Sequence, residues 1–246
     1  MVSLLGALPR RTQTFGFGEG CDWRPADLTY TPEGCADFGF ALHGEVLAHV
    51  TLRVPGEFNV MHALATMAAA VAVGAQPEDV AASLANFAAP HRRFEYTGTV
   101  CGVRLYTDYG HNPAEMRSAL DNAAHQPHNR LFAVMQPHTY SRTKSLYDHF
   151  VNDTFGEADK ILITDICGSR EKDPGDIHST MLLKSLREKG YDAAYTPTFD
   201  DAEKYLREHW QPGDLVVTHG CGDINLLNEQ IAAHGDTEKG EASHEQ

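Results

Sequence analysis

The chain has 246 residues, of which 42% are hydrophobic and 22% charged, a composition typical of a soluble globular protein with one or two domains. Its formal net charge of -14 argues against nucleic acid as a partner, because phosphate contacts need a basic face. No apolar run is long enough for a membrane span, and no secretory signal opens the chain. Five widely spaced cysteines without a Cys-x-x-Cys pair indicate reduced thiols and a cytoplasmic location.

The first 90 residues are predicted to differ from the rest of the chain. Weak apolar alternation over residues 38–54, with a turn signal at Gly44, predicts a β-hairpin. A helix of small residues over 59–73 follows, and Pro77 opens a second helix. A hairpin and two helices cannot easily bury a core of their own. We therefore expect residues 1–90 to be a partial α/β remnant of a larger domain.

Strand and helix alternate from residue 91 to residue 234. The strand-like runs cover residues 103–107, 131–135, 160–166, 193–196 and 215–218. The helix-like stretches cover residues 113–124, 142–155, 179–189, 200–210 and 224–233. This alternation predicts one domain with a Rossmann-like, doubly wound, mostly parallel sheet. The polar tail, residues 235–246, is expected to be disordered.

Five polar motifs carry most of the chemical information, and four of them directly follow a predicted strand. In an open α/β sheet such motifs meet along one edge, where ligands bind. They are rich in Arg, His and Asp, which suits phosphate, carboxylate and amine chemistry. A phosphate loop of the form Gly-x-x-x-x-Gly-Lys-Ser/Thr does not occur in the sequence. The motifs are Arg92-Arg93-Phe94-Glu95, Asp108-Tyr109-Gly110-His111-Asn112-Pro113, Gln136-Pro137-His138-Thr139-Tyr140-Ser141-Arg142-Thr143, Arg170-Glu171-Lys172-Asp173-Pro174-Gly175 and Gly220-Cys221-Gly222-Asp223.

The motif at residues 136–143 leads from a strand into a helix. Ser141 is the expected N-cap of that helix. His138 and Arg142 then lie at the start of the helix, where free N–H groups and the helix dipole favour anions. A carboxylate or phosphate clamp is favoured here over an ordinary capped helix with a solvated arginine.

The motif at residues 108–113 is a second turn from strand to helix, and its interpretation stays open. Asp108 can accept hydrogen bonds from a ribose, and His111 can donate to a phosphate or orient an amine. Asp and Asn also cap turns routinely, without any functional role.

Each of the remaining motifs has a functional interpretation and a structural one. Arg93 suits bidentate phosphate contact, although a surface ion pair with Glu95 is favoured on sequence alone. The charged run around Arg170 is either a ligand loop or a solvated loop. The glycine loop around Gly222 is at least as well explained as a tight turn. The other histidines share no metal-ligand spacing, so we predict no metal site within the chain.

Together the order and spacing of these motifs resemble the Mur ligase family, the ATP-dependent ligases of peptidoglycan precursor synthesis. The family's carboxyl-terminal domain carries Arg-Arg-Phe-Glu, Asp-Tyr-Ala/Gly-His-His-Pro and Gln-Pro-His-x-Tyr/Phe-Ser-Arg-Thr in the order found here. The last string is similar to that of the branch that adds L-alanine. Residues 54–60 resemble the end of the family's central ATPase domain, and the whole resemblance runs from about residue 15 to residue 232.

The resemblance implies an amide-forming reaction. ATP, with Mg²⁺, converts the carboxylate of UDP-N-acetylmuramate to an acyl phosphate, and the amine of L-alanine then attacks it. By resemblance, the nucleotide meets Asn59, Arg93 and Asp108. The amino acid meets Tyr109, His138, Arg142 and Arg170, and the catalytic groups are His138, Arg142 and His111.

Only the end of the central domain and the carboxyl-terminal domain have counterparts in this chain. The phosphate loop, the magnesium-binding acids and the UDP-sugar domain do not, so we expect little activity without that missing portion. Four positions also depart from the family pattern: Phe58 for His, Thr107 for Asp, Asn112 for His and Cys221 for Ala. The alternative hypothesis is a non-catalytic module or partner subunit that binds a nucleotide or an amino acid.

Overall fold

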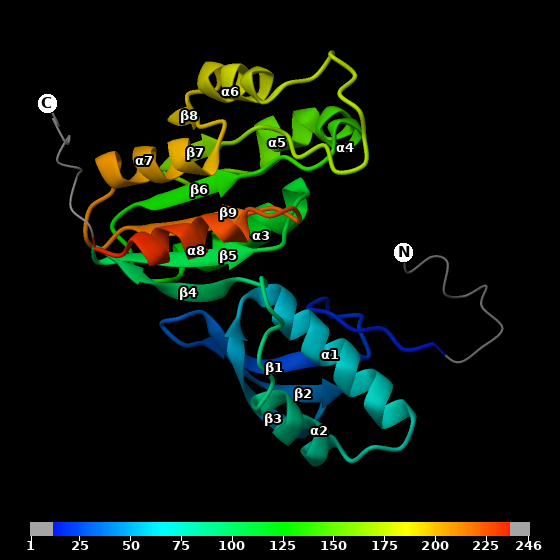
Figure 1. The fold of residues 1–246 in the computed structure, drawn as a ribbon. Coiled ribbons are helices and arrows are strands. Elements are labelled where there is room, and N and C mark those ends of the chain that lie inside the picture. The colour runs from blue at the N-terminus through cyan, green and yellow to red at the C-terminus, as the bar shows by residue number, and fades with distance from the viewer. Residues whose placement is uncertain (1–11, 237–246) are drawn as a thin grey trace, which may run out of the picture. The chain divides into compact units, whose positions relative to one another are not determined.

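The computed structural model describes residues 12–236 and divides into two compact units (Figure 1). Unit 1 is Met1–Ala88 and unit 2 is Ala89–Gln246. The expectation of a disordered tail falls outside the described residues from residue 237 onward. The expectation of disorder is wrong for Gly235 and Asp236, the first two residues of the tail. Gly235 caps the last helix, and the Asp236 carboxylate accepts a hydrogen bond from the backbone N of Cys101 at 2.6 Å.

Unit 1 is a three-stranded antiparallel sheet, in the order β1-β2-β3, with two helices. The predicted hairpin is confirmed as β2 and β3. His43 and Gly44 join these strands with positive φ angles of 50° and 88°, as a two-residue hairpin turn requires. The elements are β1 (Trp23–Tyr30), β2 (Cys35–Leu42), β3 (Glu45–Pro55), α1 (Glu57–Ala72) and α2 (Pro77–Ala85).

Unit 1 buries a core of its own, contrary to our expectation. Trp23, Phe38 and Phe40 of the sheet are fully buried, as are Leu64 and Met67 of α1. The expectation failed because the sequence did not reveal β1, which adds a third strand and supplies the Trp23 side chain. Three strands with an apolar face against helices are enough for a stable layer. The origin of unit 1 as the remnant of a larger domain stays a prediction.

The mostly parallel sheet predicted for unit 2 is confirmed. Its six strands lie in the order β4-β5-β9-β6-β7-β8, and β4 alone runs antiparallel to its neighbour. Strand β4 is an edge strand that was not predicted. The strands are β4 (Glu95–Val100), β5 (Val103–Asp108), β6 (Leu131–Met135), β7 (Lys160–Ile163), β8 (Ala193–Tyr195) and β9 (Leu215–His219).

Helices cover both faces of the unit 2 sheet, as Figure 1 shows. Side chains of α3, α5 and α6 pack in the core on one face, and those of α7 and α8 in the core on the other. The single helix predicted over 142–155 is two helices, because Leu146 leaves helical geometry with φ -107° and ψ 12°. The helices are α3 (Pro113–Ala124), α4 (Tyr140–Ser145), α5 (Tyr147–Asp153), α6 (Ser179–Glu188), α7 (Phe199–His209) and α8 (Asn225–His234).

The strand order of unit 2 creates a crevice at one point of the sheet edge. Helix α3 connects β5 to β6, yet β9 lies between these two strands. The direction of winding therefore reverses at β9, and ligands of open α/β sheets bind outside the carboxyl ends of strands at such a point. Asp108, His219 and Met135 lie in register there, at the ends of β5, β9 and β6. No helix within residues 12–236 has the length and apolarity needed to cross a membrane.

Candidate functional site

Asp108 ends β5 and shapes the loop that follows it. Its side chain is 7% exposed. Its Oδ2 accepts from the backbone N of Phe94 at 2.8 Å, and its Oδ1 from the backbone N of Gly110 at 2.6 Å. Burial raises the pKa of this carboxyl, and the two backbone hydrogen bonds only partly oppose the rise. The structure thus brings Asp108 to the predicted edge as an organiser of the loop, and its contact with a ribose stays a prediction.

The two arginines before β4 lie against Tyr109. The guanidinium carbons of Arg92 and Arg93 are 4.9 Å and 5.4 Å from the centre of the Tyr109 ring. Arg92 Nη2 also donates to the carbonyl of Gly220 at 2.5 Å. Within residues 12–236 neither guanidinium pairs with Glu95, so the favoured surface ion pair is wrong. Glu95 instead accepts from the backbone N of Arg92 at 2.7 Å and faces His91.

The start of α4 is held by strained backbone. Thr139, not Ser141 as predicted, is the N-cap, and its Oγ1 accepts from the backbone N of Arg142 at 3.4 Å. Thr139 has φ 65°, a rare value for a β-branched residue that is seen where surrounding contacts impose it. One such contact is the hydrogen bond from the backbone N of Thr139 to the carbonyl of Cys167, at 2.8 Å. Ser141 donates its backbone N to Glu171 at 2.9 Å.

Arg142 fixes the protonation of the neighbouring His138. Its Nη1 lies 3.3 Å from Nδ1 and 3.4 Å from the carbonyl O of His138. A guanidinium only donates, so Nδ1 must accept and the proton of the neutral ring is on Nε2. Burial lowers the pKa of His138, and the charges of Arg142 and His111 lower it further. His138 is therefore a neutral hydrogen-bond donor at physiological pH.

His111 has the opposite arrangement of its ring nitrogens. Its Nδ1 lies 3.1 Å from the carbonyl O of Tyr109, and a carbonyl only accepts, so Nδ1 carries the proton of the neutral ring. Nε2 is then an acceptor. The ring centres of His111 and His138 are 6.4 Å apart. The next residue, Asn112, caps α3 by accepting from the backbone N of Glu115 at 3.0 Å, which confirms the capping interpretation for this asparagine.

An open cavity adjoins these side chains on the α3 and α4–α5 side of the crevice. Its volume is about 790 Å³. Its lining includes two arginines and one aspartate, so its charge suits an anionic ligand. The lining residues are His111, Asn112, Pro113, Ala114, Arg117, Arg142, Leu146, His149 and Asp153.

Two of the predicted site residues, Arg170 and Asn59, are each described within their own unit. Arg170 is exposed on the loop after β7, and its side chain makes no hydrogen bond or ion pair within the described part of the chain. Asn59 belongs to unit 1, where its Nδ2 donates to the carbonyl of Pro55 at 2.7 Å at the start of α1. Their contacts with ligands stay predictions.

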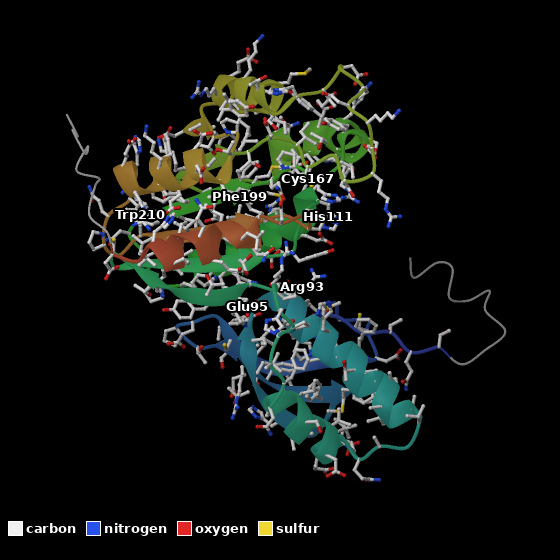
Figure 2. All side chains as sticks on the ribbon, viewed as in Figure 1. Arg93, Glu95, His111, Cys167, Phe199 and Trp210 are labelled. Carbon is white, nitrogen blue, oxygen red and sulfur yellow. The ribbon has the colours of Figure 1, made fainter. Side chains whose placement is uncertain are left out.

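Two buried residues of the crevice were not assigned from sequence. Gln136 Nε2 donates to Asp223 Oδ1 at 2.8 Å and so ties the end of β6 to the glycine loop after β9. His219 is fully buried at the end of β9, and burial lowers its pKa to about 3. Gln136 belongs to the motif at residues 136–143, but its contact with Asp223 joins distant segments and left no local pattern. His219 directly precedes the glycine loop, and within residues 12–236 its ring nitrogens have no hydrogen-bond partner. Figure 2 shows His111 and Cys167 at this edge of the sheet.

Comparison with known proteins identifies the family of this fold and site. Residues 92–222 match the family described as Mur ligase, glutamate ligase domain. The chain belongs to the Mur ligase family. It is 40% identical to UDP-N-acetylmuramate–L-alanine ligase of Caldanaerobacter subterraneus subsp. tengcongensis, over 94% of this chain and 50% of the relative. The enzyme of the same name from Acetivibrio thermocellus is 39% identical, over 94% and 49%. This Mur ligase chain therefore spans about half the length of the curated relatives it matches.

Solved structures show that this Mur ligase chain shares the family's fold. The UDP-N-acetylmuramate-alanine ligase of Thermotoga maritima superposes with a TM-score of 0.72 at 22% identity, covering 90% of this chain and 47% of that one. The MurF ligase of the same organism, determined with ADP, gives 0.64 at 16% identity, covering 95% and 52%. The predicted fold class is thereby confirmed.

Proposed function

We propose that this chain is the carboxyl-terminal portion of a cytoplasmic, ATP-dependent UDP-N-acetylmuramate–L-alanine ligase of peptidoglycan precursor synthesis. One observation carries the proposal. Within the described residues the Arg142 guanidinium forms no ion pair at contact distance with a carboxylate, and its Nη1 lies against His138 and the sulfur of Cys221. A guanidinium held at the mouth of a crevice suits the carboxylate of an amino acid, which it can bind with two parallel hydrogen bonds.

The two histidines supply complementary proton chemistry for amide formation. The amine of L-alanine must lose a proton to attack, and the Nε2 lone pair of His111 can accept it. As the N–C bond forms, negative charge builds on the acyl oxygen, to which Nε2–H of His138 can donate. The C–O bond to the phosphoryl group then breaks and inorganic phosphate leaves. Tyr109 and Arg170 complete the proposed surroundings of the amino acid.

The nucleotide part of the site is only partly supplied by this chain. We assign Arg93 to the phosphates of ATP, Asp108 to its ribose and Asn59 to its adenine. Within residues 12–236 no three His, Cys, Asp or Glu side chains gather as a metal site. As the family resemblance implies, we place the phosphate loop and the main Mg²⁺ ligands on the other half of the complete ligase.

A chimaera with a relative tests the proposal. The purified chain alone is expected to hydrolyse no ATP and to form no amide. When it replaces the matching half of the Caldanaerobacter subterraneus subsp. tengcongensis ligase, we expect UDP-N-acetylmuramoyl-L-alanine to form. Arg142→Lys should raise the KM for L-alanine about tenfold to a hundredfold, because this factor corresponds to the free energy of one charge-assisted hydrogen bond. Arg187→Lys on α6 is the matched control and should leave the KM unchanged.

A second candidate is the non-catalytic binding module. The buried core of unit 1 favours it, because a part with its own core does not depend on further chain to bury its apolar side chains. This candidate predicts that a folded chimaera forms no product, while the isolated chain is a monomer that binds ATP or L-alanine. Product formation by the chimaera would support the ligase proposal and contradict the binding-module candidate.

A further inference from the structure

Two cysteines lie on neighbouring loops at the edge of the unit 2 sheet. Cys167 follows β7 and Cys221 follows β9, and these two strands flank β6. The Sγ of Cys167 is only 3.3 Å from the point where a Cβ on Gly222 would lie, and Gly222 is the residue after Cys221. The loop that carries one thiol is therefore packed against the loop that carries the other.

Both loops are anchored to the segment that follows β6. The backbone N of Cys167 donates to the carbonyl of Pro137 at 2.8 Å, and the backbone N of Thr139 donates to the carbonyl of Cys167 at 2.8 Å. From the other side, Sγ of Cys221 lies 3.9 Å from Nη1 of Arg142. Both cysteines are partly exposed, so a small reagent from solvent can reach them. Both cysteines therefore contact the segment 137–142, and both are accessible from solvent.

The loop after β9 is held at Gly220 by Arg92 and at Asp223 by Gln136, and Cys221 lies between these two anchors. Bond formation brings the two Cα atoms to about 5.5 Å and the sulfurs to about 2.05 Å. Cys221 is flanked on both sides by glycine, and glycine backbone can turn without a side-chain penalty. Burial raises the pKa of Cys221, but the adjacent Arg142 opposes this rise and favours the thiolate, the form that reacts.

We propose that Cys167 and Cys221 are an oxidant-responsive pair that closes to an intrachain disulfide with a hydroperoxide. One thiolate attacks hydrogen peroxide, the O–O bond breaks, and a sulfenic acid and one water form. The second thiolate attacks that sulfur, the S–S bond forms, and the hydroxyl leaves as a second water. Two thiols are oxidised, one peroxide is reduced to two waters, and both thiol protons end in water. The bond joins the loops after β7 and β9 across the end of β6, beside Arg142.

Mass spectrometry of the purified chain tests this pair. After hydrogen peroxide treatment and alkylation with iodoacetamide, we expect the loss of two hydrogen atoms and a cross-linked peptide pair containing Cys167 and Cys221. Dithiothreitol should restore the two separate peptides. Cys221→Ala and Cys167→Ser should each abolish the cross-link, whereas Cys101→Ser, as the matched control, should retain it. Alanine is the residue that the family pattern places at position 221, which makes the Cys221→Ala protein a conservative choice.

A second reagent tests the pair in the unsubstituted chain. Phenylarsine oxide binds two nearby thiols at once, so one equivalent should protect both Cys167 and Cys221 from iodoacetamide. A cross-link through Cys21, Cys35 or Cys101 would overturn the proposal. Separate sulfinic acids at positions 167 and 221 would do the same, as would an arsenical-treated chain in which both thiols are still alkylated.

Discussion

Arg142 donates from Nη1 to Nδ1 of His138 across 3.3 Å, and this contact determines which nitrogen of the imidazole carries the proton. The cation also disfavours a second proton on the ring, so the contact keeps His138 neutral. His111 is held by a carbonyl and carries its proton on the other nitrogen. The two imidazoles therefore face one crevice with different abilities, one as donor and one as acceptor.

Removal of the Arg142 charge should raise the pKa of His138. Arg142→Met keeps much of the side-chain volume but takes away the cation that disfavours the imidazolium. Burial and the charge of His111 remain, so the pKa should rise without losing all of its downward shift. The imidazole titration followed by NMR in the isolated chain measures the change. Arg187→Met on α6 should leave the His138 titration unaltered, and an unchanged or lower pKa in Arg142→Met would contradict the assigned contact.

Asp214 should be a large contributor to the stability of unit 2. Its side chain is 1% exposed, and it accepts from Arg130 Nη2 at 2.6 Å and from the backbone N of Gln211 at 2.7 Å. Asp214→Asn weakens these charge-assisted bonds and should lower the free energy of unfolding by about 2 kcal/mol. Urea unfolding followed by circular dichroism gives the value. The exposed Lys184–Glu188 pair is the control, since Lys184→Ala should cost less than about 0.5 kcal/mol.

Turn and helix-start preferences of individual residues correctly predicted two features of the fold. The turn at His43 and Gly44 and the start of α3 at Pro113 follow from backbone preferences of the residues themselves. Strand β1 was missed because Pro25 and Asp27 are poor strand residues, and an edge position tolerates them. Ser141 was predicted as the cap of α4, whereas the structure has Thr139 there with φ 65°, a value that local preferences make rare for a β-branched residue.

The location of the candidate site was predictable from the sequence, but its internal contacts were not. The edge location of Asp108 and Arg142 was predicted because their motifs come directly after strand-like runs. The contacts that orient the site were not predictable, because they join distant segments. Gln136 binds Asp223, and Cys167 binds Thr139, only once β6, β7 and β9 are adjacent. Sequence spacing carries no signal for such pairs.

Gly222 should tolerate no side chain. A Cβ at this position would collide with Oε1 of the buried Gln136, which is itself held by Asp223. Gly222→Ala should therefore displace the loop after β9 and destabilise unit 2 by about 1–3 kcal/mol, as overpacking does. Gly156→Ala is the control, because nothing lies within 4 Å of its added Cβ. Equal unfolding midpoints for the two variants would show that the loop relaxes freely.

His219 should make unit 2 sensitive to acid. Burial lowers its folded-state pKa to about 3, whereas an unfolded histidine titrates near about 6.5. Between these values the unfolded chain binds the extra proton, so stability falls as the pH falls through this window and is fully retained above it. One such group contributes a slope of up to about 1.4 kcal/mol per pH unit.

Substitution of His219 isolates this slope from that of the other titrating groups. His219→Met replaces the ring by an uncharged side chain of similar size, and within residues 12–236 neither nitrogen of that ring has a hydrogen-bond partner to lose. The difference in unfolding free energy between variant and parent should therefore grow in favour of the variant from about pH 7 to about pH 5. Hydrogen-exchange protection of the β9 amides measures it within unit 2. A difference that stays constant with pH would show that His219 titrates alike in both states.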